Sequence, residues 1–343
     1  MNKEVEKFIS KFSQWGQEGH LPKRSLRKLS AILRKVIYEE LPNRDTTFHW
    51  VERDIMNSAN LNCVLVEQDV WLYPNGNKEC LMVGSLFPFW DQGLRKLCVD
   101  EYIFDNISTF LFFASQYVGR SCMINALGAI ALTYNRSCDF RGHSMTKMTV
   151  GNDSAHRLED MFRTIPAPRR FPNGKEKELK VWCSILNSLD PYINRILFNY
   201  IRAINLNEEG FAEEAIVALD NTVDVSVQLL RQRCKGLVGE RLDILALNLD
   251  LNARDIYILD CLYQLRCFFG AHPSVSKWWD FGETYEHSFN GYFDSIKTLI
   301  YKIAQFEASN RIVEKNPCVW SEWFNKNVMM LWDAVWFQRI PKV

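Results

Sequence analysis

The second half of the chain has apolar residues at every third or fourth position, in stretches separated by glycine, proline or helix-capping residues. This spacing is typical of amphipathic α-helices that bury one face. The pattern predicts helices over these approximate ranges: 191–204, 209–234, 253–269, 289–306 and 317–336. Because each has one apolar stripe and the connections are modest, we expect an antiparallel helical bundle.

The first half mixes element types. Two strand-like runs, Val64–Tyr73 and Glu79–Ser85, flank Pro74-Asn75-Gly76-Asn77, and Asn-Gly between such runs predicts a β-hairpin. Helical segments are expected over about residues 100–162, and the apolar stretch 107–134 has enough polar interruptions to be buried helix and not a membrane span. A helix over 23–41 has a basic polar side, which is usually solvated; contact with RNA or a partner is the alternative.

The clearest boundary in the chain lies at residues 164–175, where three prolines and a glycine stand among charged residues. A regular element cannot continue through this stretch. We therefore expect two domains: an α+β N-terminal domain over residues 1–165, which contains the hairpin, and a helical bundle over residues 176–343. The fold as a whole is expected to be mainly α.

The composition of the chain excludes several classes of function. The formal net charge is zero, which argues against a general nucleic-acid coating protein and leaves room for RNA contact at a local cleft. The ten cysteines form no C-x-x-C pair and no zinc-ligand spacing with histidine, so no metal site is expected. The stretch Gly142–Lys147 lacks the order of a phosphate-binding loop, and we expect no cofactor. Scattered cysteines and no apolar signal-peptide core at the start favour a soluble cytoplasmic protein.

One segment carries a pattern suited to chemistry. Asn252 can cap the helix that follows, while Gly270 and Pro273 predict its end, so Arg266 falls in the last turn and His272 just beyond it. A histidine can move the proton of a ribose 2′-hydroxyl, and an arginine can hold the phosphate. The alternative is structural: a charge match to the helix end and a hydrogen-bonded histidine.

Residues near this pair could assist it. Ser276 and Lys277 are candidate phosphate contacts. Trp278, expected in a loop beside Trp279, could stack an exposed base, although packing against the bundle explains tryptophans at least as well. Asp220 and Asp224 fall near the apolar stripe of their helix, where they either orient Arg266 or His272 or form an exposed acidic edge.

The spacing Arg266-x5-His272 between two amphipathic helices resembles the Arg-x(4–6)-His motif of the HEPN superfamily (higher eukaryotes and prokaryotes nucleotide-binding domain). The residue after the arginine, often polar in active members, is Cys267 here. The resemblance implies a helical bundle and a metal-independent endoribonuclease that acts as a homodimer and leaves 2′,3′-cyclic phosphate ends.

The resemblance also implies a biological setting, namely a toxin or anti-phage effector whose N-terminal domain binds a protein partner or antitoxin. The alternative is a catalytically silent dimerisation or partner-binding scaffold, which Cys267 and the neutral overall charge favour.

Overall fold

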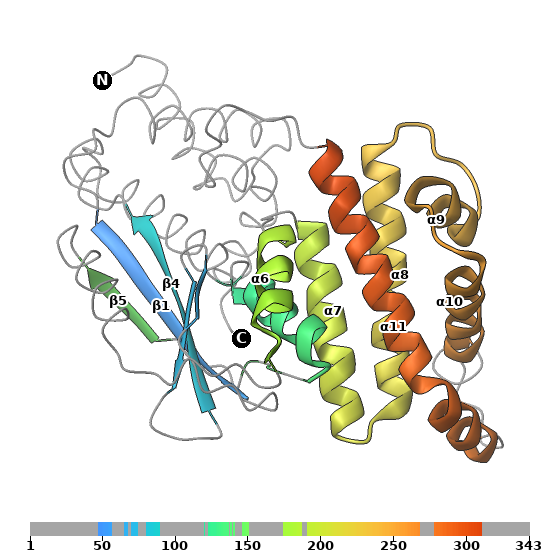
Figure 1. Ribbon diagram of the computed structural model, residues 1–343, viewed down its shortest axis with the longest axis horizontal. Helices are drawn as coiled ribbons and strands as arrows, with labels where there is room; N and C mark the ends of the chain where they lie inside the picture. Colours follow the sequence, from blue (N-terminus) through green and yellow to red (C-terminus); the bar gives the residue numbers. More distant parts are fainter. Residues whose placement is uncertain are drawn as a thin grey trace, which may run out of the picture.

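The described part of the protein is mainly helical, with an antiparallel sheet beside a helical bundle (Figure 1). None of the helices in the described part is long and apolar enough to cross a bilayer. The computed structural model describes these residues: 47–56, 65–67, 70–74, 80–89, 120, 123–136, 138, 140, 146–150, 174–186, 191–267 and 278–310.

The sheet has five strands in the spatial order β2-β3-β4-β1-β5, and every neighbouring pair is antiparallel. The central strands β1 and β4 pair over their full length, from Thr47 opposite Phe89 to Met56 opposite Cys80. The strands are β1 (Thr47–Met56), β2 (Leu65–Glu67), β3 (Val70–Pro74), β4 (Cys80–Phe89) and β5 (Thr146–Val150).

The predicted hairpin is present, because β3 pairs with β4 from Val70 opposite Ser85 to Pro74 opposite Leu81. Its first arm is not one strand, however. β2 and β3 are separate strands that pair with each other. The helical prediction for residues 100–162 is wrong at β5, which extends the sheet beside β1 instead. It is correct at residues 123–134, which are helical and buried except for a half-buried Tyr134.

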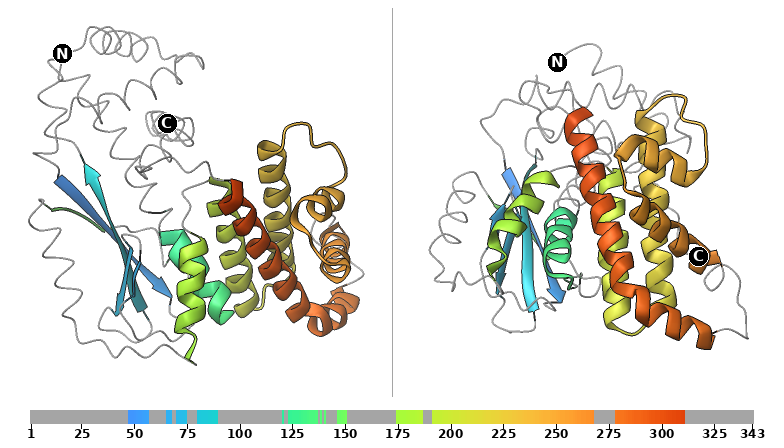
Figure 2. Two further views of the ribbon diagram at one scale, coloured as in Figure 1. Left: turned by 45° about the horizontal axis from the view of Figure 1, so that its top comes forward. Right: turned by 45° about the vertical axis from the view of Figure 1, so that its right-hand side comes forward.

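The bundle contains the helices α6 (Glu176–Ile185), α7 (Pro191–Glu208), α8 (Ala212–Arg233), α9 (Arg241–Leu249), α10 (Ala253–Leu265) and α11 (Trp278–Asn310). Figure 1 shows α6 on the sheet side of α7 and α10 at the far side of the bundle, and Figure 2 shows α11 running across α7 and α8. Proline at the start of α7 and a left-handed Gly236 after α8 agree with the sequence. The short helix α9 was not predicted, and the expected helices at 23–41 and 317–336 lie outside the described residues.

The tryptophan pair does not lie in a loop. α11 begins at Trp278 and includes Trp279, so the prediction of a tryptophan-bearing loop is wrong. The segment that begins at Trp278 contains no proline and leads directly into apolar residues at helical spacing. Both features favour a helix over a loop. The side chains of both residues lie outside the described part of the structure.

The core runs from the sheet into the bundle. Ile55 of β1 is fully buried in the same hydrophobic cluster as the helical segment 123–132 and α7. Gly128 of that segment lies so close to α7 that a Cβ atom there would meet Leu197 Cδ2 at 2.9 Å. Apolar packing therefore continues on both sides of residues 164–175, and the division of the chain into two domains at that stretch stays a prediction.

Candidate functional site

The predicted site residues fall into two groups. Arg266 is described, and it caps the C-terminal end of α10 with helical backbone angles, its N–H bonded to the carbonyls of Leu262 and Tyr263. This agrees with the prediction that Arg266 lies at the end of its helix, although α10 ends at Leu265, before the predicted end near residue 269. His272, Ser276 and Lys277 lie outside the described residues, and so does the Trp278 side chain.

α10 is anchored at both ends. At its start Asn252 Oδ1 accepts from the Asp255 N–H at 2.8 Å, as the sequence predicts for a capping residue. Ser295 of α11 donates to Asp255 at 2.9 Å, which fixes this end of α10 against the neighbouring helix. Leu259 and Leu262 fill the core from the middle of the helix. Arg266 holds the other end, so the guanidinium leaves a helix whose position is set along its whole length.

Four charged residues, two from α8, one from the start of α9 and one from the end of α10, meet at this point, and we call them the charge cluster: Asp220, Asp224, Arg241 and Arg266. Arg266 Nη1 donates to Asp220 Oδ2 and, at 2.8 Å, to Asp224 Oδ2. Arg241 Nη1 donates to the same Asp220 oxygen at 3.0 Å and to Asp224 Oδ1 at 2.8 Å, and Arg241 Nη2 bonds Asp220 Oδ1. Each carboxylate therefore bridges both guanidinium groups.

Burial differs sharply within the charge cluster. The Asp220 side chain is 0% exposed, whereas those of Asp224 and Arg266 are 35% and 30% exposed. A buried carboxylate is tolerated only when it is paired and hydrogen-bonded, and Asp220 has two cationic partners. The sequence left open whether the two aspartates orient Arg266 or form an exposed edge. In the structure both aspartates contact Arg266.

The carboxylates fix the charge of both arginines. Hydrogen bonding to Asp220 raises the pKa of Arg266, against a smaller opposing effect of burial, and Asp224 adds to the increase. Burial works to lower the pKa of Arg241, but hydrogen bonds and charges from Asp220 and Asp224 outweigh it and the pKa is raised. Both guanidinium groups thus stay protonated.

Tyr263 lies at the edge of the charge cluster. The sequence predicts it as part of the apolar surface of its helix, but the residue is 41% exposed. The Arg241 guanidinium carbon lies 4.8 Å from the centre of the Tyr263 ring, which is cation–π geometry. Hydrogen bonding with the Cys267 side chain raises the pKa of Tyr263.

Sequence reasoning missed Arg241, because it missed the helix that begins with this residue. A signal for it existed on α8. Asp220 and Asp224 are four residues apart on one helix face, and like charges at that spacing repel unless a cation lies between them. The aspartate pair therefore indicates that basic side chains from elsewhere in the chain lie beside it. In the structure these side chains are Arg241 and Arg266.

The described cysteines and other potential metal ligands form no metal site beside the charge cluster. Within the residues that the structure describes, no group of three or more histidine, cysteine, aspartate or glutamate side chains is arranged to hold a metal ion. Cys267 and Cys261 are half-buried, Cys138 and Cys183 are buried, and none of these four forms a disulfide bond. Comparisons with protein-family models, with curated proteins and with solved structures found no match to the chain.

The arrangement leaves donors of Arg266 available for an anion. Within the described residues, both carboxylate contacts of Arg266 leave from Nη1. Nη2 and Nε point along the other edge of the planar fork, the edge that holds a phosphate or carboxylate in bidentate fashion. A permanently charged guanidinium, held in place and partly exposed, is suited to binding a phosphodiester.

Proposed function

We propose that the protein is a metal-independent endoribonuclease of the HEPN type. In this proposal Arg266 binds the scissile phosphate through Nη2 and Nε, and His272 moves the proton of the attacking 2′-hydroxyl or of the leaving 5′-oxygen. The reaction forms a 2′,3′-cyclic phosphate and releases a 5′-hydroxyl end. The observation that carries the proposal is the guanidinium of Arg266, which α10 presents at its end and two carboxylates hold in place.

The physical argument is preorganisation. A donor that is already oriented and charged stabilises the developing charge of a transition state without reorganising first. Asp220 and Asp224 orient Arg266 through one nitrogen and leave its other edge for substrate. A single histidine cannot easily carry out both proton transfers, so we propose a homodimer that contributes two copies of Arg266 and His272 to one site.

A defence or toxin role goes with this activity, with the N-terminal domain binding an antitoxin or other protein partner. Expression of the active enzyme should then slow the growth of its host, and Arg266→Ala should relieve the effect. This growth assay is a cheap first screen for the proposed function.

The decisive experiment is cleavage of mixed cellular RNA in the presence of EDTA. We expect wild-type protein to leave cyclic-phosphate ends, and we expect His272→Ala and Arg266→Ala to lose roughly 100-fold or more in rate. Arg266→Lys should also be impaired, because lysine keeps the charge but not the planar fork. Unchanged cleavage by Arg266→Ala would rule out the proposed role of this residue.

Arg233→Ala is the matched control. Arg233 also forms a two-pronged ion pair, with Glu307 at 2.9 and 3.2 Å, and its side chain is 24% exposed, but it belongs to a different part of the bundle. Its removal takes the ion-pair partner from the nearly buried Glu307 carboxylate, a disturbance at least as large as that caused by removal of Arg266, after which Asp220 and Asp224 keep Arg241. A loss of cleavage that appears in Arg266→Ala and not in Arg233→Ala therefore reports on the site and not on stability.

The second candidate function is a silent scaffold that dimerises or binds a partner. It is favoured by the balance of the charge cluster, in which two carboxylates neutralise two guanidinium groups. In that case wild-type protein should cut no RNA in the EDTA assay but should self-associate or bind its partner. Arg266→Ala should leave this self-association or partner binding unchanged.

A further inference from the structure

Tyr263 is an exposed aromatic side chain that the fold does not need for its core. Its helix neighbours Leu259 and Leu262 are fully buried, whereas Tyr263 is 41% exposed. Single exposed apolar residues are common on protein surfaces and do not by themselves indicate a binding site. What distinguishes Tyr263 is how it is held and what lies beside it.

The Tyr263 ring is held in place on the surface. The Arg241 guanidinium carbon lies 4.8 Å from the ring centre, in cation–π geometry. Tyrosine has only two side-chain torsions, so this contact restricts its freedom before any ligand arrives. Ordering a side chain in advance removes a cost that binding would otherwise carry.

The ring also lies beside the proposed phosphate-binding group. Tyr263 and Arg266 are three residues apart on one helix, a spacing that places their Cβ atoms about 5–6 Å apart on the same face. A fixed aromatic ring next to a fixed guanidinium matches the two parts of a nucleotide, since the base stacks on the ring while the phosphate bonds the guanidinium.

We propose that Tyr263 stacks an unpaired base of single-stranded RNA next to the phosphate that Arg266 binds. This inference rests on the proposed function for the role of Arg266 and extends it by naming the substrate class and a base-binding subsite. Stacking tolerates every base, because each has a π-face, so Tyr263 favours single-stranded over paired RNA without selecting a sequence.

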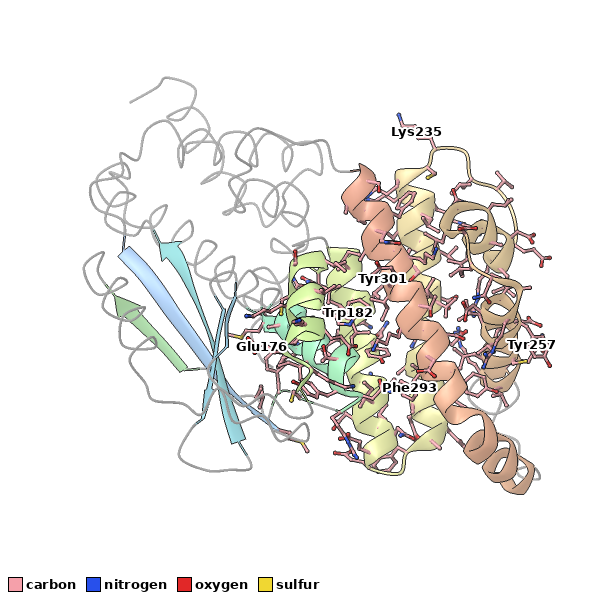
Figure 3. All side chains as sticks on the ribbon, viewed as in Figure 1. Glu176, Trp182, Lys235, Tyr257, Phe293 and Tyr301 are labelled. Carbon is pink, nitrogen blue, oxygen red and sulfur yellow. The ribbon has the colours of Figure 1, made fainter. Side chains whose placement is uncertain are left out.

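Tyr257 provides a matched control on the same helix. It is more exposed than Tyr263, at 68%, and it is likewise followed four residues on by a cysteine, Cys261. Figure 3 shows Tyr257 on the outer side of α10. Six residues separate it from Tyr263, which on an α-helix puts the two side chains about 120° apart, so Tyr257 faces away from Arg266.

The test measures binding of a single-stranded RNA of roughly ten nucleotides, within the usual site sizes, with one 2-aminopurine base and all 2′-hydroxyls methylated. Methylation removes the nucleophile, so binding is measured without cleavage. Stacking of the 2-aminopurine quenches its fluorescence. We expect wild-type protein to bind with quenching, and Tyr263→Ala and Tyr263→Leu to bind roughly 5- to 100-fold more weakly with little quenching. Tyr263→Phe and Tyr257→Ala should behave as wild type.

The outcomes separate this inference from the proposed function. Wild-type binding that is unchanged by Tyr263→Ala or Tyr263→Leu, or the absence of any binding, overturns the stacking role of Tyr263. Cleavage of unmodified RNA is measured in parallel. Tyr263-dependent binding without cleavage supports the stacking role and overturns the nuclease, whereas cleavage with the same KM in Tyr263→Ala keeps the nuclease and overturns the stacking role.

Discussion

Replacement of Asp220 by asparagine tests how far the charge cluster stabilises the fold. The carboxylate is fully buried and accepts hydrogen bonds from Arg241 and Arg266. Removing one member of a buried ion pair typically costs about 3–5 kcal/mol, because an uncompensated charge stays behind. Here the two arginines keep Asp224 as a partner and are 17% and 30% exposed, so water offsets part of the loss. We therefore expect Asp220→Asn to lower the free energy of unfolding by about 3 kcal/mol.

The measurement is urea denaturation of the full chain, with the free energy of unfolding taken from the midpoint and slope. Asp224→Asn is the matched control on the same helix, and its 35% exposure predicts a cost below about 1 kcal/mol. Removing one orphaned cation should repair the damage, so Arg241→Met in the Asp220→Asn background should recover at least about 1 kcal/mol.

Three results would refute this reasoning. The first is an Asp220→Asn protein as stable as wild type, and the second is an equal loss in Asp224→Asn. The third is a double variant, Asp220→Asn with Arg241→Met, that is less stable than Asp220→Asn alone. An equal loss in Asp224→Asn would mean that burial of the carboxylate does not decide its contribution, and a less stable double variant would mean that the orphaned cation is not the source of the loss.

Three other changes have definite expected results. Gly128→Ala should destabilise the fold by about 1–2 kcal/mol in urea denaturation, because the new methyl group meets Leu197, and Leu197→Ala in the same chain should cost less than the two changes added. Burial would raise the pKa of Glu178, but the hydrogen bond and charge of Lys297, together with Lys175 and Trp182, outweigh burial and lower it, so the stability lost in Lys297→Met at about pH 7 should shrink as the pH falls below the usual value of 4.5. Asn252→Ala should cost about 1 kcal/mol through the lost cap of α10, and should leave the unfolding slope unchanged.

The sequence predicts helices well where one apolar stripe and a cap agree. α8 and α10 are cases, since the buried positions of α8 recur at helical spacing and Asn252 caps α10. α9 escapes prediction because its leucines lie on both faces. Leu245 and Leu249 are buried while Leu247 is 83% exposed, so no stripe stands out over nine residues. β5 escapes because a short strand takes its identity from pairing, here with β1 from far earlier in the chain.

The candidate site was predictable only in part for a similar reason. The position of Arg266 at a helix end follows from local signals, and the structure confirms it. Its partners do not follow, because Asp220 is 46 residues and Asp224 is 42 residues away in sequence. The exposure of Tyr263 depends on which way α10 faces, and spacing alone assigned it to the core. The roles of His272, Ser276 and Lys277 stay predictions.

The double pairing of Asp220 has a consequence for how this chain can change during evolution. If Arg266 is lost, the buried carboxylate still has Arg241, so the fold survives the loss of the group proposed to bind phosphate. If Asp220 is lost, both arginines lose their buried partner at once. Descendants without Arg266 can therefore persist as folded, inactive proteins and acquire binding roles, whereas descendants without Asp220 must also replace an arginine.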